Sequence, residues 1–206
     1  MLTPVDAQFL TEATASLASH LYASLDKGRL LAHEHYDQHK MDTNAYTKGR
    51  TDLTRDHARR HLELAEEELG PWKLRKASSG RLHLVNNLLL VRVLHGLPFA
   101  ETPAPGHNQA RVSYYRNPPA DLFGVEASRL LAVWSADEKS GETVIRIVRP
   151  TGTWKHGHTA QTDIDFVLPR QVEDFTKFEF IPDDKDFTLP FEFDKEELRE
   201  EGDTGA

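Results

Sequence analysis

The sequence contains no cysteine among its 206 residues. Disulfide bonds and thiolate metal sites are therefore excluded, and a small secreted scaffold held together by disulfides is not expected. No apolar run approaches the roughly 20 residues that a membrane-spanning helix needs. The N-terminus, Met1 to Asp6, lacks the basic and then apolar stretch of a signal peptide. These absences predict a cytoplasmic protein without a membrane segment.

Several motifs of known enzymes are also missing. The sequence has no Gly-x-Ser-x-Gly nucleophile motif, no glycine-rich dinucleotide fingerprint after a strand and no His-Glu-x-x-His metalloprotease motif. Without these motifs and without cysteine, nucleophilic catalysis has no evident starting residue. The sequence by itself therefore indicates an architecture more clearly than a reaction.

The net charge of −8 is distributed unevenly. Residues 1–80 carry 11 Lys and Arg against 12 Asp and Glu, a net of −1, and residues 81–160 carry 9 against 6, a net of +3. Residues 161–206 carry 5 against 15, a net of −10. A strongly basic surface typical of nucleic-acid-binding domains is not indicated, and only a local one in the middle of the chain agrees with these counts.

The first third of the chain is predicted to be helical. Thr3 is a suitable N-cap before Pro4, and Gly28 is expected to end or interrupt the first helix. A second helix is predicted to begin at Thr51 or Thr54 and to stop at Gly70. The first helix is indicated by apolar residues at three- and four-residue spacing, namely Val5, Phe9, Leu10, Ala13, Leu17, Leu21 and Leu25.

After residue 80 the apolar pattern changes to the alternation typical of strands. Six strands are predicted at 81–85, 88–94, 110–115, 128–134, 143–148 and 162–168, the first two forming a hairpin around Asn86 and Asn87. The sequence thus predicts a single α+β domain over residues 1–170, with a helical part (1–70) and a sheet part (80–170). N-terminal helices are expected to pack on one face of a five- to six-stranded, mostly antiparallel sheet.

Residues 171–206 form an acidic, phenylalanine-rich C-terminal arm. Two interpretations remain open: a last strand and short helix that pack on the domain, which we favour because six phenylalanines are much apolar surface to leave in water, or an arm that docks on a partner. For the second interpretation the candidate partner-binding residues are Phe187, Phe191 and Phe193.

Eleven histidines suggest a metal hypothesis. His35 and His39 are four residues apart, and so are His57 and His61, which is the spacing that lets two imidazoles on one helix face bind a divalent metal ion. Those four are the candidate ligands. Histidines on solvated helix faces are the alternative, and it is favoured because the cations Arg59 and Arg60 flank the second pair and repel a metal ion.

The loop that begins at Arg149 has the composition of a phosphate site. In this hypothesis His156 or His158 is a general base, Lys155 and Arg149 stabilise charge on phosphate oxygens, and Trp154 stacks on a base. The loop is not a Walker loop, because the Gly-Lys-Ser/Thr ending is missing. An ordinary strand connection is the alternative that the turn residues favour.

Arg111 and Tyr115 are further candidates for ligand or partner binding. In the strand predicted at 110–115 they lie on one face. An arginine and a tyrosine on one face can bind an anionic ligand or an acidic partner, or can simply cover the sheet.

The middle of the chain resembles a known group of proteins. The order of a helix, Leu88–Val93, Asn108–Arg111, Tyr114–Tyr115 and Leu130–Trp134 is similar to that of uncharacterised actinobacterial and phage-type proteins encoded beside helix-turn-helix regulators. The resemblance covers residues 70–155. It implies a bacterial toxin–antitoxin-like module, a protein partner such as the helix-turn-helix regulator, and no particular reaction.

Three functions are compatible with these features. We expect a partner-binding component of a bacterial regulatory or defence module, because the acidic arm suits a basic partner surface. The alternative is a hydrolase acting on a phosphate-containing or nucleic-acid substrate, with or without a divalent metal ion. A small-ligand-binding protein without catalysis is the third.

Overall fold

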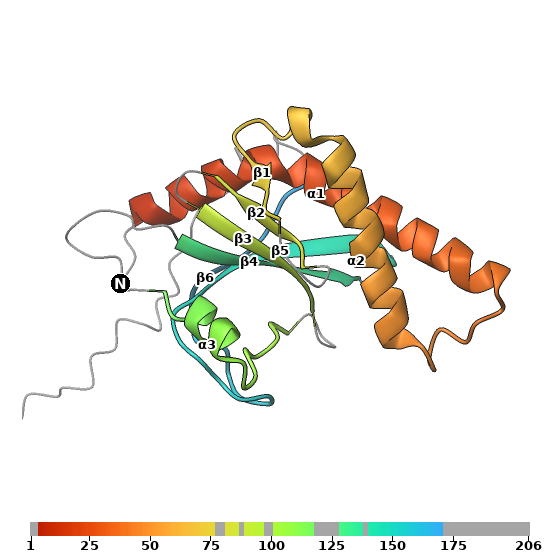
Figure 1. The fold of residues 1–206 in the computed structure, drawn as a ribbon. Coiled ribbons are helices and arrows are strands. Elements are labelled where there is room, and N and C mark those ends of the chain that lie inside the picture. Colours follow the sequence, from red (N-terminus) through yellow and green to blue (C-terminus); the bar gives the residue numbers. More distant parts are fainter. Residues whose placement is uncertain are drawn as a thin grey trace, which may run out of the picture.

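The computed structural model describes residues 4–76, 81–86, 89–96, 101–117, 128–137 and 140–170. Two long helices cross one face of a sheet, and a short helix lies on its other side (Figure 1). The elements in chain order are α1 (Pro4–Gln38), α2 (Thr47–Leu64), a 3-10 turn (Glu66–Glu68), β1 (Lys73–Leu74), β2 (His83–Val85), β3 (Leu89–His95), α3 (Gln109–Tyr115), β4 (Ser128–Ala136), β5 (Thr143–Pro150) and β6 (Thr162–Val167). The predicted α+β class with N-terminal helices is confirmed.

The strands form one sheet in the order β1-β2-β3-β4-β5-β6. Four neighbouring pairs are antiparallel, including β2 with β3 as predicted, and the β3–β4 pair is parallel. A parallel pair needs a crossover connection, and α3 lies in that connection. The sheet is therefore mixed, and the crossover places α3 on the face opposite to α1 and α2.

The prediction of a strand at residues 110–115 is wrong, because this segment belongs to helix α3. Asn108 caps the helix: its Oδ1 accepts hydrogen bonds from the backbone N–H groups of Ala110 (3.0 Å) and Arg111 (3.3 Å). The adjacent side chains of Tyr114 and Tyr115 are both buried, which a one-face-buried strand does not allow. The strand at Lys73–Leu74 was not predicted, since two residues carry too little pattern.

The first helix is longer than predicted. It begins at Pro4 as expected but continues through Gly28 to Gln38. The second helix begins at Thr47, so the predicted caps lie inside it, and Thr54 is 2% exposed. It ends at Leu64, before the 3-10 turn, and not at Gly70.

Gly28 lies where α1 and α2 cross. A Cβ atom at this position would be 2.4 Å from the Thr54 carbonyl oxygen and 3.1 Å from the Ala58 nitrogen, both on α2. Glycine is a poor helix former, but here its missing side chain permits a helix contact that no other residue allows. Packing thus overrides the propensity on which the predicted helix end rested.

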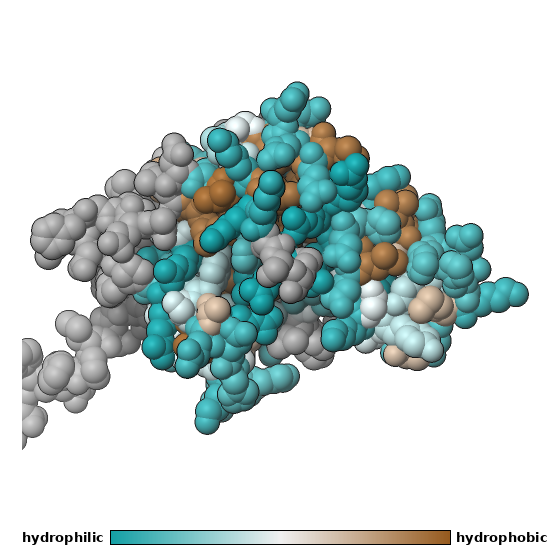
Figure 2. Space-filling view, in the orientation of Figure 1, coloured by the Kyte–Doolittle hydropathy of each residue, from teal (hydrophilic) through white to brown (hydrophobic). Residues whose placement is uncertain are grey.

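The centre of the sheet is buried on both faces. On β4, Leu130, Ala132 and Trp134 belong to the core shared with α1 and α2. The alternate residues Leu131 and Val133 belong to a smaller core with residues of α3. Figure 2 shows a mostly hydrophilic surface with separate small hydrophobic areas in the view over the long helices. Among the described helices, none combines the length and apolarity that crossing a membrane requires.

Replacement of Gly28 by alanine should destabilise the protein by about 1–3 kcal/mol, because the gain in helix propensity is smaller than the strain of the overlap with Thr54. Urea denaturation measures this change. The matched variant is Gly49→Ala in α2, where the nearest atom to an added Cβ is the Tyr36 hydroxyl at 2.7 Å, a side-chain group whose hydrogen bond to the Tyr46 carbonyl oxygen costs less to displace than the α2 backbone. The loss at position 49 should be smaller, and equal stability of Gly28→Ala and the wild type would contradict the crossing role.

Candidate functional site

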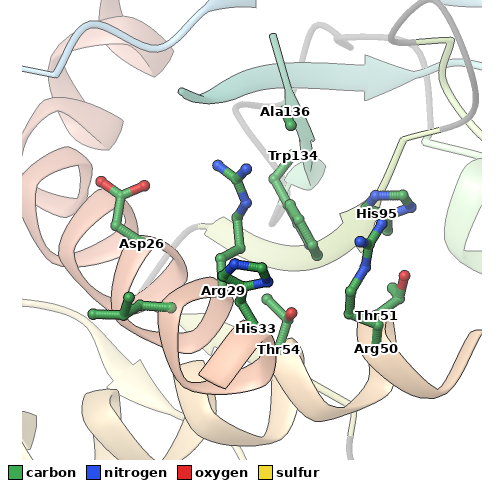
Figure 3. Close-up of a pocket in the computed structure, with 10 residues that line it drawn as sticks. Asp26, Arg29, His33, Arg50, Thr51, Thr54, His95, Trp134 and Ala136 are labelled. Atoms are coloured by element: carbon green, nitrogen blue, oxygen red, sulfur yellow. The ribbon is translucent and has the colours of Figure 1, made fainter. Parts of the chain in front are cut away.

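A pocket of about 560 Å³ opens between α1, α2 and the ends of two strands. Figure 3 shows Arg29 and His33 on one side of Trp134 in this view, with Arg50 and His95 on the other. The lining residues are Asp26, Arg29, Leu30 and His33 of α1, Arg50, Thr51 and Thr54 of α2, His95 of β3, and Trp134 and Ala136 of β4. Its volume is in the usual range for small-molecule sites, about 300–1,000 Å³.

The local structure explains why these side chains meet. β3 and β4 are parallel with His95 opposite Trp134, so both strands end at the same edge of the sheet. In open α/β sheets ligands bind outside the carboxyl ends of parallel strands. The α1 residues Asp26, Arg29 and His33 recur at helical spacing and therefore share one face. They flank Gly28, so the helix crossing also brings α2 to the pocket.

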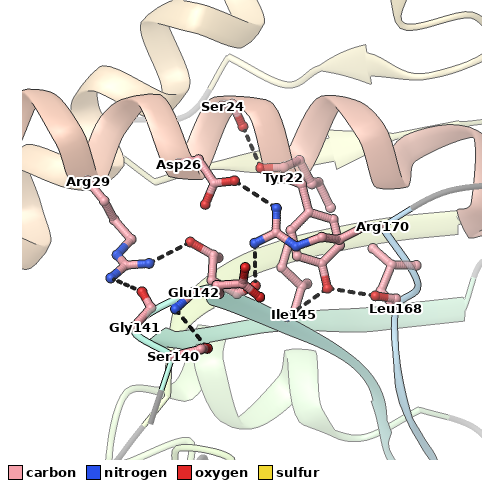
Figure 4. A network of polar contacts seen from close by, with 12 residues as sticks. Tyr22, Ser24, Asp26, Arg29, Ser140, Gly141, Glu142, Ile145, Leu168 and Arg170 are labelled. Atoms are coloured by element: carbon pink, nitrogen blue, oxygen red, sulfur yellow. Dashed lines mark hydrogen bonds and ion pairs between the residues drawn. The ribbon is translucent and has the colours of Figure 1, made fainter. Parts of the chain in front are cut away.

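Arg29 is fixed by neutral oxygen atoms. Its Nη1 donates to Thr143 Oγ1 and its Nη2 to the Gly141 carbonyl oxygen, each at 2.8 Å (Figure 4). Burial lowers the pKa of Arg29. The charge of Asp26 raises this pKa, and the guanidiniums of Arg50 and Arg170 lower it further. Arg29 remains protonated, since an arginine pKa starts far above neutrality. None of its hydrogen bonds goes to a carboxylate in the described part of the chain.

The carboxylate among the described lining residues, Asp26, is engaged elsewhere. Asp26 Oδ2 accepts a hydrogen bond of 2.9 Å from Arg170, which also donates to the Thr143 carbonyl oxygen at 2.9 Å. The Arg170 guanidinium lies 4.4 Å from the centre of the Tyr22 ring. The Tyr22 hydroxyl donates to the Leu168 carbonyl oxygen (2.6 Å). This network ties α1 to β5 and to the end of β6 (Figure 4).

Arg50 and His95 line the pocket on the other side of Trp134 from Arg29. Arg50 is exposed, and its side chain has no hydrogen bond or ion pair with any described residue. The His95 ring stands at 66° to the Trp134 ring, with 4.4 Å between centroids. Burial, and then the charges of Arg50 and Arg29, lower the pKa of His95. At neutral pH the charges of Arg29 and Arg50 therefore lie beside a neutral His95, while Asp26 is bonded to Arg170.

The four predicted metal ligands do not converge. The rings of His35 and His39 are 4.5 Å apart at the exposed end of α1. His57 and His61 are half-buried on α2. Within the residues that the structure describes, no three His, Asp or Glu side chains come close enough to hold a metal ion.

The loop residues predicted to be catalytic divide into two groups. Arg149 is 3% exposed, and its guanidinium forms an ion pair with Asp163 on β6, so it links β5 to β6. Lys155, His156 and His158 are exposed in the loop. A phosphate site formed by Arg149 together with the three loop residues stays a prediction. The ion pair with Asp163 does not favour it, because it already engages the Arg149 guanidinium.

The residues predicted to bind a ligand or partner are also separated. Tyr115 is fully buried, donates to the Pro103 carbonyl oxygen (2.8 Å) and packs 5.2 Å from Trp154, which is 9% exposed. Both aromatic rings belong to the smaller core. Arg111 is partly exposed on α3. Phe187, Phe191 and Phe193 lie outside the described residues.

Sequence reasoning missed the pocket residues Arg29, Arg50, His95 and Trp134. A signal was present in α1: if the helix is continued through Gly28, Asp26, Arg29 and His33 line up on one face. The contribution of His95 and Trp134 depends on the parallel pairing of two strands far apart in the sequence, and no local pattern encodes that pairing.

A second group of polar residues lies on the face of the sheet that carries α3. His83 of β2 stacks on Tyr114, with 6.2 Å between ring centroids and 21° between planes. Burial, and then the charges of Arg92, Arg75 and Arg81, lower the pKa of His83 to about 4. His83 is therefore neutral at pH 7 and at pH 5.

Comparison of the chain with protein-family models, with curated proteins and with solved structures gave no match. The resemblance to proteins encoded beside helix-turn-helix regulators consequently stays a prediction.

Acidification should destabilise the protein through His83. The unfolded histidine, with a pKa near 6.5, binds a proton that the folded one, with a pKa of about 4, rejects. Stability is therefore lost as the pH falls from 7 towards 4, by about 1–2 kcal/mol from this residue at pH 5.

Urea denaturation of the wild type and of His83→Phe at pH 7 and pH 5 measures the effect. Phenylalanine keeps a ring on Tyr114 and removes the titration, so the variant should lose less stability between the two pH values. His39→Phe, at the exposed end of α1, is the control and should keep the pH dependence of the wild type. Identical pH dependence in His83→Phe would contradict the assignment.

Proposed function

We propose that the protein binds a small anionic ligand in the pocket between α1, α2 and the ends of β3 and β4. The observation that carries the proposal is the absence of a neutralising carboxylate among the described residues: Arg29 donates to neutral oxygens, Arg50 has no described partner, and Asp26 is bonded to Arg170. Guanidinium groups that point into a cavity without a counter-charge are suited to a carboxylate or phosphate.

The walls of the pocket indicate the size and shape of such a ligand. Leu30 is 49% exposed and offers an apolar surface at the rim. Trp134 provides an aromatic floor between the two positively charged sides (Figure 3). A few polar groups in a partly apolar pocket of this volume are typical of metabolite sites. A phosphate or carboxylate attached to a small organic body fits this description.

His95 should couple ligand binding to protonation. Its pKa is lowered by burial and by the same two arginines that would bind the anion. A bound anion offsets those charges and thereby raises the pKa of His95. Binding is then accompanied by proton uptake and becomes stronger as the pH falls through the range in which the complex protonates.

The two functions expected from the sequence have different support. The partner-binding role depends mainly on residues 171–206, which lie outside the described residues, and it is tested by a pull-down with a chain truncated at residue 170. The hydrolase role retains an anion-binding element, now centred on Arg29 and Arg50. Among the described residues no group of three His, Asp or Glu side chains could hold a metal ion, and we propose binding without assigning a reaction to the pocket.

Isothermal titration calorimetry with inorganic phosphate, nucleoside monophosphates and small dicarboxylates should identify a ligand class. Arg50→Ala should weaken binding of the best ligand at least tenfold, because one charge-assisted contact to an anion is worth about 1.5–3 kcal/mol. Lys48→Ala removes the same charge from an exposed position on the same helix that does not line the pocket, and it is the matched control. Equal affinities of the two variants for every anion would overturn the proposal.

A further inference from the structure

Three basic residues lie side by side: Arg75 directly follows β1, His83 is on β2 and Arg92 is on β3. The backbone N–H of Arg75 donates to the His83 carbonyl oxygen at 2.9 Å, and His83 is the direct partner of Arg92 in the β2–β3 pairing. Residues directly opposite each other share a face of the sheet. Their neighbours Leu84 and Val91 belong to the core under α1 and α2. The three basic residues therefore occupy the opposite face, beside α3.

Arg92 is buried, and no residue that the structure describes serves as its counter-ion. It is 9% exposed, and its guanidinium carbon lies 5.9 Å from the centre of the Tyr114 ring. Its side chain has no hydrogen bond or ion pair with any described residue. Burial lowers the pKa of Arg92, and the nearby Arg111 and Arg81 lower it further, whereas Tyr115 and Tyr114 raise it. A buried charge without a partner is strongly unfavourable and needs a compensating group.

His83 adds a second unmatched polar group. Its Nε2 atom is buried and has no hydrogen-bond partner among the described residues. The charged residues around it, Arg92, Arg75 and Arg81, are all cations. An acceptor that carries negative charge would satisfy both this imidazole and the Arg92 guanidinium.

The platform under these groups is rigid. The Tyr114 hydroxyl lies 2.7 Å from the carbonyl oxygens of both Leu90 and Leu130, on adjacent strands of the parallel pair. Its ring is thereby fixed against the sheet, with His83 stacked on it and Arg92 over it. Preorganised donors of this kind lose little entropy when a ligand binds.

We propose that this face is a phosphate-binding site, formed by Arg92 and His83 and surrounded by Arg75, Arg81 and Arg111. A phosphate group has several acceptor oxygens and carries up to two negative charges, so it can bond to more than one of these donors at once. Two sources supply this chemistry: a free phosphate compound, or the backbone of a single nucleic-acid strand. The row of Arg75, His83 and Arg92, together with the exposed position of Arg75 and Arg81, favours a nucleic-acid strand.

The site is separate from the pocket of the proposed function. Arg92 and His95 are three residues apart on β3, so their side chains lie on opposite faces of the sheet. Either site can be present without the other. All tests of this inference are therefore made in the Arg50→Ala background, which weakens the pocket and leaves the α3 face unchanged.

Arg92→Met is the decisive variant, because methionine keeps the length of the side chain and removes the charge. Binding of inorganic phosphate and of a fluorescent single-stranded decanucleotide is measured by thermal shift and by fluorescence anisotropy. Arg92→Met should weaken both at least tenfold, and Arg111→Ala should weaken both to a smaller extent. Lys48→Met on α2 is the charge-matched control and should have no effect.

Thermal stability without ligand gives an independent readout. Removal of a buried charge that no described carboxylate pairs should raise the Tm of Arg92→Met by a few degrees in phosphate-free buffer. A merely structural arginine would give a lower Tm. Loss of binding together with a gain in stability is the signature of a site kept for its ligand.

The probes separate the sources. At least tenfold tighter binding of the oligonucleotide than of inorganic phosphate, with a salt dependence that Arg92→Met reduces, identifies a nucleic-acid strand, whereas binding of phosphate alone identifies a small phosphate compound. The inference is overturned if neither probe binds, if Arg92→Met binds both as well as its parent, or if polyglutamate competes better than the oligonucleotide.

Discussion

The contact between α1 and α2 at Gly28 is the constraint on which the candidate site depends. Because the Thr54 carbonyl oxygen occupies the space of a Cβ atom, the two helices approach each other more closely than side chains normally permit. Arg29 follows Gly28 directly, and its guanidinium extends from the crossing to the β4–β5 turn at Gly141. The contact that closes the core therefore also orients Arg29 and positions α2, which carries Arg50.

The crossover through α3 divides the chemistry of the molecule between two faces. It makes β3 and β4 parallel and brings their carboxyl ends, with His95 and Trp134, to one edge. It also places α3 on the opposite face, where Tyr114 supports Arg92 and His83. With antiparallel pairing, one of the two strand ends would lie at the far edge of the sheet, and the pocket would lose a wall.

The sequence predicted the class of the fold because period and composition are local properties. The long apolar stripe of α1 and the alternation in β4 and β5 identify elements, and their order identifies an α+β protein. Residues 110–115 resemble one more short strand of the predicted sheet part, whereas in the structure Asn108 caps a helix at this place. The candidate site was not predicted, since Arg29, Arg50 and His95 meet only through the helix crossing and the parallel pairing.

The arginines of the two sites have no carboxylate partner among the described residues, although the protein has a net charge of −8. Acidic residues are plentiful, yet the described carboxylate of the pocket, Asp26, is bonded to Arg170, and no described carboxylate pairs with Arg92. A folded protein usually stabilises a buried arginine with a carboxylate of its own. Arg92 has none among the described residues, which costs stability and suits the side chain to an external anion; this exchange is the physical basis for proposing a binding role for the α3 face.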